Sequence, residues 1–197
     1  MNKLQLPQVT LIAMTGVQFD EHKRVLDKMR ESIEFGGVKI VWNDLIKDVD
    51  DWNRRIVYDL WKFVDTEYAF LFHADGYIIH PELWNPKWLE YDYCGAPWKL
   101  PTDDFSFRDI HGKIQRVGNS VGLRSRKLLK LATDLDLKWR DFHGFTHEDG
   151  WFSVNMRHIY EGFGCKFMPF EESLDFGKEY ELPEHKGRDT FCFHQAT

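Results

Sequence analysis

Asp75 lies where a short apolar run ends, and this placement is typical of a ligand site. The run Tyr68–Phe72 stops at His73, Gly76 follows Asp75 directly, and a second run, Tyr77–Ile79, comes next. Apolar runs of this length, rich in β-branched and aromatic residues, predict buried strands. Buried strands in open α/β sheets present polar groups to a ligand crevice at their carboxyl ends. A carboxylate and an imidazole there often hold a divalent cation; a plain Asp-Gly hairpin turn is the alternative interpretation.

A glycine-rich stretch from Gly118 to Gly122 forms a second candidate site. Small polar residues, among them Asn119, separate the two glycines, and a helix is predicted shortly after them. Such a stretch is typical of a loop that approaches a ligand closely. Arg124 and Arg126 add positive charge beside it, which would suit a diphosphate. A turn next to a solvated basic surface is the alternative interpretation.

Two adjacent acids, Glu148 and Asp149, precede Gly150 at the start of a predicted helix. Acids in the first helical turn are stabilised by the helix dipole, so capping is the ordinary explanation. The functional explanation is a general base, or a carboxylate that binds a substrate hydroxyl. The sequence leaves both explanations open.

A histidine follows an aromatic segment close to the end of the sequence. Phe191 and Phe193 are too apolar for a free chain end, and alternation along an extended segment puts Cys192 and His194 on the opposite face. We therefore expect the two phenylalanines to anchor the tail in the core and His194 to turn towards Asp75. A packed histidine without a ligand is the alternative.

Strands and helices alternate in the first half of the chain. The predicted strands lie at 8–14, 38–42 and 68–72, and the predicted helices at 19–35 and 52–64. Short buried strands separated by helices imply a mostly parallel central sheet flanked by helices. The second half is less regular, with helices predicted at 125–135 and 148–160, a strand at 165–168 and a loop-like tail beyond 171. The predicted fold class is α/β, as one domain over residues 1–197 with a Rossmann-like first half and a mixed second half.

The composition narrows the functional classes. The chain has 197 residues and a formal net charge of −6, which suits one globular domain and makes nucleic acid an unexpected partner. No apolar stretch is long enough to span a bilayer and no signal peptide is recognised, so a cytoplasmic protein is expected. The three cysteines are widely spaced, which disfavours zinc. Neither a G-x-G-x-x-G nor a P-loop motif occurs, so dinucleotide and P-loop sites are not supported.

Taken in order, these features resemble those of the GT-A-fold glycosyltransferases, which use nucleotide-sugar donors. The order is a strand-end Asp-Gly, a glycine-rich loop, an acidic pair that opens a helix, and a late histidine. More narrowly, the chain is similar to a little-characterised glycosyltransferase-like family with LPxVTL, YDYxGAPW, VGNxxxxLRS and FxFH segments. Those segments lie here at Leu6–Leu11, Tyr91–Trp98, Val117–Ser125 and Phe191–His194.

The resemblance implies a role for each candidate residue. Mn²⁺ or Mg²⁺ would be held by Asp75, His194 and His73. A UDP- or GDP-sugar donor would contact Thr15, Gly118, Asn119, Arg124 and Arg126. The general base towards the acceptor hydroxyl would be Asp149, with Glu148 as the second choice. A sugar, on a glycan or similar acceptor, would be bound by Asp92 and Trp98.

One departure from the resemblance leaves other functions open. The position of the metal-binding DXD motif reads His73-Ala74-Asp75, so it holds one aspartate instead of two and leaves metal dependence open. A non-catalytic nucleotide-sugar-binding module would suit this incomplete motif. The same acids and histidine would also suit a metal-dependent phosphoester hydrolase, although no ligand pairs with two-metal spacing are visible.

Overall fold

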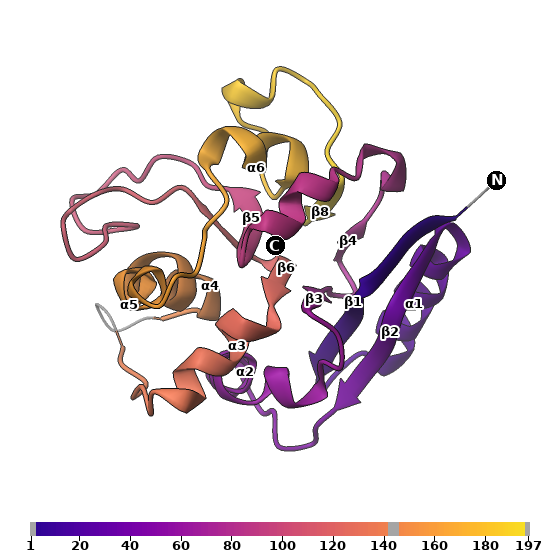
Figure 1. Ribbon diagram of the computed structural model, residues 1–197. Coiled ribbons are helices and arrows are strands. Elements are labelled where there is room, and N and C mark those ends of the chain that lie inside the picture. The colour runs from indigo at the N-terminus through magenta and orange to yellow at the C-terminus, as the bar shows by residue number, and fades with distance from the viewer. Residues whose placement is uncertain (1–2, 142–145, 196–197) are drawn as a thin grey trace.

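The computed structural model, which describes residues 3–141 and 146–195, contains a central sheet of five strands (Figure 1). These strands are β1 Leu4–Thr15, β2 Ile33–Trp42, β3 Tyr68–Leu71, β5 Tyr93–Pro97 and β6 Val117–Ser125. Their order across the sheet is β2-β1-β3-β6-β5. β1 pairs in parallel with β2 and β3, whereas β6 runs antiparallel to β3 and β5. The parallel first half and mixed second half agree with the prediction.

Helices and a smaller sheet complete the fold. The helices are α1 Phe19–Ser32, α2 Val49–Tyr58, α3 Arg126–Asp134, α4 Glu148–Gly150, α5 Arg157–Gly162 and α6 Phe170–Phe176. The smaller sheet has the order β4-β8-β7, with β4 at Gly76–Ile78, β7 at Gly177–Lys178 and β8 at Cys192–His194. In Figure 1, α1 lies beside β1 and β2, and α4 and α5 lie on the far side of the molecule from α1.

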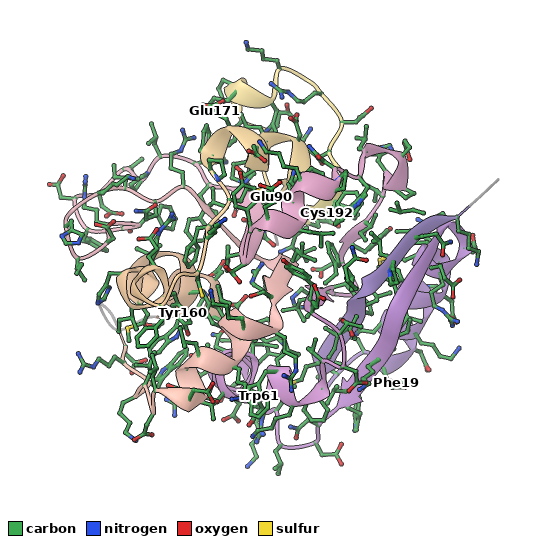
Figure 2. All side chains as sticks on the ribbon, viewed as in Figure 1. Phe19, Trp61, Glu90, Tyr160, Glu171 and Cys192 are labelled. Carbon is green, nitrogen blue, oxygen red and sulfur yellow. The ribbon has the colours of Figure 1, made fainter. Side chains whose placement is uncertain are left out.

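The central strands are apolar because both of their faces are buried. Along β1, Leu11 and Ala13 belong to a core with α1, α6 and β8, whereas Ile12 and Met14 belong to a core with α2, α3 and α5. Successive side chains of a strand point to opposite faces, so a strand covered on both sides is apolar throughout. Figure 2 labels one member of each core, Cys192 of the first and Tyr160 of the second.

Helix α1 ends earlier than the sequence predicts. The prediction extended this helix to residue 35, but it ends at Ser32 and β2 begins at Ile33. Ile33 and Phe35 pair with Leu4 and Leu6 of β1, and both are buried. Pairing with β1 therefore outweighs the helical periodicity of this segment, as tertiary contacts often do.

The second half departs further from the prediction. The stretch predicted as a glycine-rich loop is strand β6. The helix predicted at 148–160 is broken by a π-helical turn at Trp151–Asn155. Residues 165–168 make only an isolated bridge, between Phe167 and Tyr93, and the tail predicted as a loop contains α6. These segments take their conformation from partners far along the chain, which local patterns do not encode.

The C-terminal segment enters the structure as β8. Gly76 pairs with His194 and Ile78 with Cys192. Phe191, just before β8, is fully buried among aromatic rings, while Phe193 is half-buried against Tyr77. Cys192 is buried too, so both faces of the tail are covered at its start; Phe191 anchors it in the core, whereas Phe193 is only half-buried.

All three cysteines are buried and unpaired: Cys94, Cys165 and Cys192. Within the described ranges, no helix has the length and apolarity that crossing a membrane would need.

Candidate functional site

A cleft of about 610 Å³ lies at the carboxyl ends of the parallel strands. β1 ends there at Thr15, β3 leads into it through residues 73–75, and residues 46–49 reach it between β2 and α2. Because β6 is antiparallel, its first residues lie at the same edge. Seven of the residues predicted to act in a site line this cleft: Thr15, His73, Asp75, Asn119, Glu148, Asp149 and His194.

Asp75 and His194 form a pair in this cleft. Pairing of Gly76 with His194 brings the imidazole Nε2 to 3.7 Å from the Asp75 carboxylate. His194 Nδ1 lies 3.1 Å from Asn119 Oδ1, and that oxygen also accepts a hydrogen bond from the backbone N–H of Val121. Because Asn119 Oδ1 is therefore an acceptor, His194 Nδ1 carries the proton and Nε2 offers its lone pair towards Asp75.

Burial lowers the pKa of His194, although Asp75 and Asp149 oppose the shift. A neutral imidazole with a directed Nε2 is the form that binds metals. Among the described residues, no group of three or more His, Cys, Asp or Glu side chains is gathered as a metal site. A cation between Asp75 and His194 would therefore take its remaining ligands from water and a bound phosphate, as Mg²⁺ does in many phosphate sites.

His73 packs between two rings. Its imidazole lies 5.1 Å from the Trp52 ring and stacks on His194 at 5.2 Å between centroids. Burial, followed by the nearby His194, lowers the pKa of His73 to about 3, so its ring is neutral. Its Nε2 is buried without a hydrogen-bond partner among the described residues. His73 thus packs against His194 and helps to orient it, while the metal contact expected of His73 stays a prediction.

The acidic pair lies across the cleft from these histidines on α4. Asp149 accepts hydrogen bonds from the backbone N–H groups of Asn119, at 3.0 Å, and Gly150, at 2.7 Å. Glu148 is only 2% exposed, and burial together with the Asp149 charge raises its pKa well above the usual value. Its Oε1 has no hydrogen-bond partner among the described residues. Ionisation of Glu148 is therefore disfavoured beside the oriented Asp149 side chain.

Asn119 organises the cleft. Its backbone N–H holds Asp149, its side-chain oxygen holds His194, and its carbonyl accepts a 2.6 Å hydrogen bond from Arg124. Its φ of 83° lies in the left-handed region, which asparagine tolerates better than most residues. The sequence analysis placed Asn119 against the donor; the structure adds that it connects both halves of the site.

Arg124 does not reach the cleft, which corrects its expected contact with phosphates. The side chain is 1% exposed and donates hydrogen bonds to three backbone carbonyls, those of Cys94, Leu123 and Asn119. Its guanidinium also lies 3.7 Å from the centroid of the Tyr93 ring. Arg124 is thus committed to holding β5 and β6 together.

Two further candidates lie away from the cleft. Arg126 donates to the carbonyl of Val64, and Asp92 accepts from the Ser125 hydroxyl and from the backbone N–H of Lys166. Both line a separate hollow near the amino end of β3. Asp92 accepts hydrogen bonds that hold the structure there. Arg126, expected to contact the donor, and Asp92, expected to contact a sugar, therefore do not line the cleft that contains Asp75.

Gly118, Trp98 and Thr15 have local structural roles. A Cβ at Gly118 would lie 1.7 Å from the Trp98 ring, so this glycine makes room for the tryptophan. Trp98 lines a second hollow that adjoins the cleft. Thr15 does line the cleft, but its hydroxyl is bonded to the backbone of Val17.

Three charged residues that line the cleft were not predicted from the sequence: Asp48, which caps α2, and also Lys47 and Glu179. Lys47, in the connection between β2 and α2, is the only lysine or arginine among the described residues that line the cleft. Glu179 follows β7 and lies between the cleft and the second hollow. Lys47 and Glu179 belong to irregular segments with no periodic pattern or motif, so no signal in the sequence singled them out.

Comparison with known proteins gives a family and a fold. A family model described as "Protein of unknown function (DUF5672)" matches residues 38–194. The chain belongs to this family. A solved structure titled "Crystal structure of a glycosyltransferase involved in the glycosylation of the major capsid of PBCV-1" superposes with a TM-score of 0.57 and 11% sequence identity. The match covers 94% of this chain and 91% of that one, so the two share a fold. No curated protein matches the chain.

Proposed function

We propose that this member of the DUF5672 family is a glycosyltransferase that moves a sugar from a nucleotide-diphosphate donor to a hydroxyl acceptor. The observation that carries the proposal is the cleft itself, which brings Asp75 and His194 together with an oriented Asp149. Its place at the carboxyl ends of β1 and β3 is where open α/β sheets bind ligands. The fold shared with a glycosyltransferase supports the same reaction class.

The charges of the cleft favour a donor that binds with a divalent cation. Its lining includes five acids, which are Asp48, Asp75, Glu148, Asp149 and Glu179, against Lys47 as the permanent cation. The negative charges of this lining would repel a diphosphate unless a cation entered with it. Asp75 and His194 would hold Mn²⁺ or Mg²⁺, which when bound stabilises the charge of the departing diphosphate.

Asp149 is the group we assign to the acceptor proton. Two backbone N–H groups fix its carboxylate, so it can accept a proton without first reorienting. Burial, followed by the neighbouring Asp149 charge, raises the pKa of Glu148 and disfavours its ionisation. If the reaction retains configuration, the same Asp149 carboxylate orients the acceptor hydroxyl instead.

Release of nucleoside diphosphate tests this function. The protein is incubated with UDP- and GDP-sugars and Mn²⁺, with and without simple sugar acceptors, and the released UDP or GDP is measured. Release that increases with acceptor, together with a glycosylated product, is expected. Binding of a nucleotide sugar without any release would instead indicate the non-catalytic module. Inorganic phosphate released from a phosphate ester would indicate the hydrolase.

A further inference from the structure

A second hollow of about 790 Å³ adjoins the cleft. The two share His147, Asp149 and Glu179. The opposite wall of the hollow is formed by residues 98–110, which leave the sheet after β5 in the long connection to β6 (Figure 1). A group bound in the hollow would therefore face Asp149 from the side opposite the cleft.

We propose that this hollow binds the acceptor and that the acceptor is a carbohydrate; the inference rests on the proposed glycosyl transfer. Trp98 and Phe107 stack at 4.5 Å between centroids with an interplanar angle of 17°. Phe105 also lines the hollow and is 54% exposed, and the Tyr180 ring lies 4.2 Å from the Lys99 ammonium. Trp98 is only 6% exposed and its ring stacks on Phe107, so these two rings shape the wall, and the exposed part of the Phe105 ring is what the apolar face of a sugar would pack against.

The polar groups of the hollow suit hydroxyls better than an apolar chain. Glu179 is half-buried, and burial raises its pKa while a hydrogen bond from Asn119 opposes the shift. An alkyl chain would cover the half-buried Glu179 and Asp149 carboxylates without offering either of them a further hydrogen bond, which is costly. Sugar hydroxyls can donate to both. Arg108 and Asp109 take no part, because each is already bonded to backbone groups of its own loop.

The aromatic wall and the base are fixed by neighbouring residues of β6. Gly118 lies beneath the Trp98 ring, with no room for a side chain. Asn119, the next residue, holds the Asp149 carboxylate through its backbone N–H. One short piece of strand therefore holds both the Trp98 ring at the base of the wall and the Asp149 carboxylate, which is the rigidity that positioning an acceptor requires.

Saturation-transfer NMR with methyl glycosides of glucose, galactose, mannose and N-acetylglucosamine tests the proposal, with hexanol as an apolar probe. Each is measured with and without UDP and Mn²⁺. Glycoside binding to the wild type is expected, and Phe105→Ala or Glu179→Gln should weaken it at least about tenfold, the size of one lost charge-assisted hydrogen bond or stacking contact. Phe163→Ala is the matched control, because Phe163 is also 54% exposed and lies outside the hollow.

Three results would overturn the inference: no glycoside binds, hexanol binds in their place, or Phe105→Ala and Phe163→Ala behave alike. Thermal melting of each variant identifies any that fail to fold, and the Glu179→Gln change alters charge with little change of shape. Titration of UDP and GDP with Mn²⁺ separates this test from that of the proposed function. Nucleotide binding without glycoside binding refutes the hollow alone, and glycoside binding without nucleotide binding refutes the transferase while supporting the saccharide site.

Discussion

Replacing Arg124 with methionine should lower the stability of the fold and leave nucleotide affinity nearly unchanged. Arg124 donates to the carbonyls of Cys94 and Asn119, both at 2.6 Å, and to that of Leu123 at 3.1 Å. Methionine fills a similar volume but leaves these carbonyls without their donor. A hydrogen bond to a charged group contributes about 1.5–3 kcal/mol. Burying the guanidinium costs free energy, and methionine avoids this cost, which offsets part of the loss of several such bonds.

The net loss should be about 3 kcal/mol of unfolding free energy, which corresponds to roughly 6–12 °C in Tm for a domain of this size. Differential scanning calorimetry and urea unfolding measure it. Arg126→Met is the matched control, since Arg126 donates a hydrogen bond to the Val64 carbonyl and is only part-buried. It should lose about 1 kcal/mol.

The affinity of the Arg124→Met protein for nucleotide distinguishes a structural role of Arg124 from a donor contact. If Arg124 contacted the donor phosphates, its loss would weaken binding at least about tenfold, as expected for one charge-assisted bond. We expect less than about threefold, measured well below the unfolding transition. An Arg124→Met protein with unchanged Tm and strongly weakened nucleotide binding would contradict the structural role.

Three other substitutions test the site and its supports. Asp149→Asn should lower turnover at least about 10²-fold, because the amide cannot take the acceptor proton; if nucleoside diphosphate release stayed normal, the acid would be only a helix cap. Glu148→Gln should raise Tm at pH 7 and change it less at pH 4. The pKa of Glu148 is higher in the folded chain than in the unfolded chain, so the stability of the wild type falls as pH rises from the unfolded-state pKa to the folded-state pKa. Equal effects at both pH values would show that Glu148 is not a high-pKa acid. Phe191→Ala should cost about 3–5 kcal/mol in urea unfolding, since the ring is fully buried; a loss below about 1 kcal/mol would mean that the tail is not anchored.

The first half of the fold was predictable because burial there follows the strand period. β1 and β3 are covered on both faces, so their sequences are continuous apolar runs, and helices with one apolar face separate them. The main error, at Ile33–Phe35, arose where β-strand pairing competes with a helical pattern over three residues. The local sequence does not show whether this segment continues the helix or pairs with β1.

The second half was harder because its glycines and arginine mark close approaches inside the protein. A Cβ at Gly95 would lie 1.8 Å from the Gly118 carbonyl, and Gly118 itself makes room for Trp98. In the sequence, Gly118 and Arg124 looked like parts of a basic ligand loop. The guanidinium instead donates hydrogen bonds to backbone carbonyls, and the sequence alone does not show that these carbonyls lie near it.

The candidate site could be predicted in part, because the order of strands along the chain indicates which strand ends lie at the same edge of the sheet. The structure brings Asp75, His194 and Asp149 to one cleft, as expected from their order along the chain. Glu179 could not be predicted, because it reaches the cleft from an irregular segment whose path depends on β7 and β8.

Isothermal titration of UDP and GDP, with Mn²⁺ or with chelator, tests the central claim most directly. The account predicts that one nucleotide binds with Mn²⁺, that chelation abolishes binding, and that Asp75→Asn weakens it at least about tenfold. Asp27→Asn is the control, because this carboxylate on α1 is 51% exposed, against 44% for Asp75, and is not among the residues that line the cleft. Nucleotide binding that is equally tight with chelator present, or in Asp75→Asn, would contradict a cation-assisted donor site in this cleft.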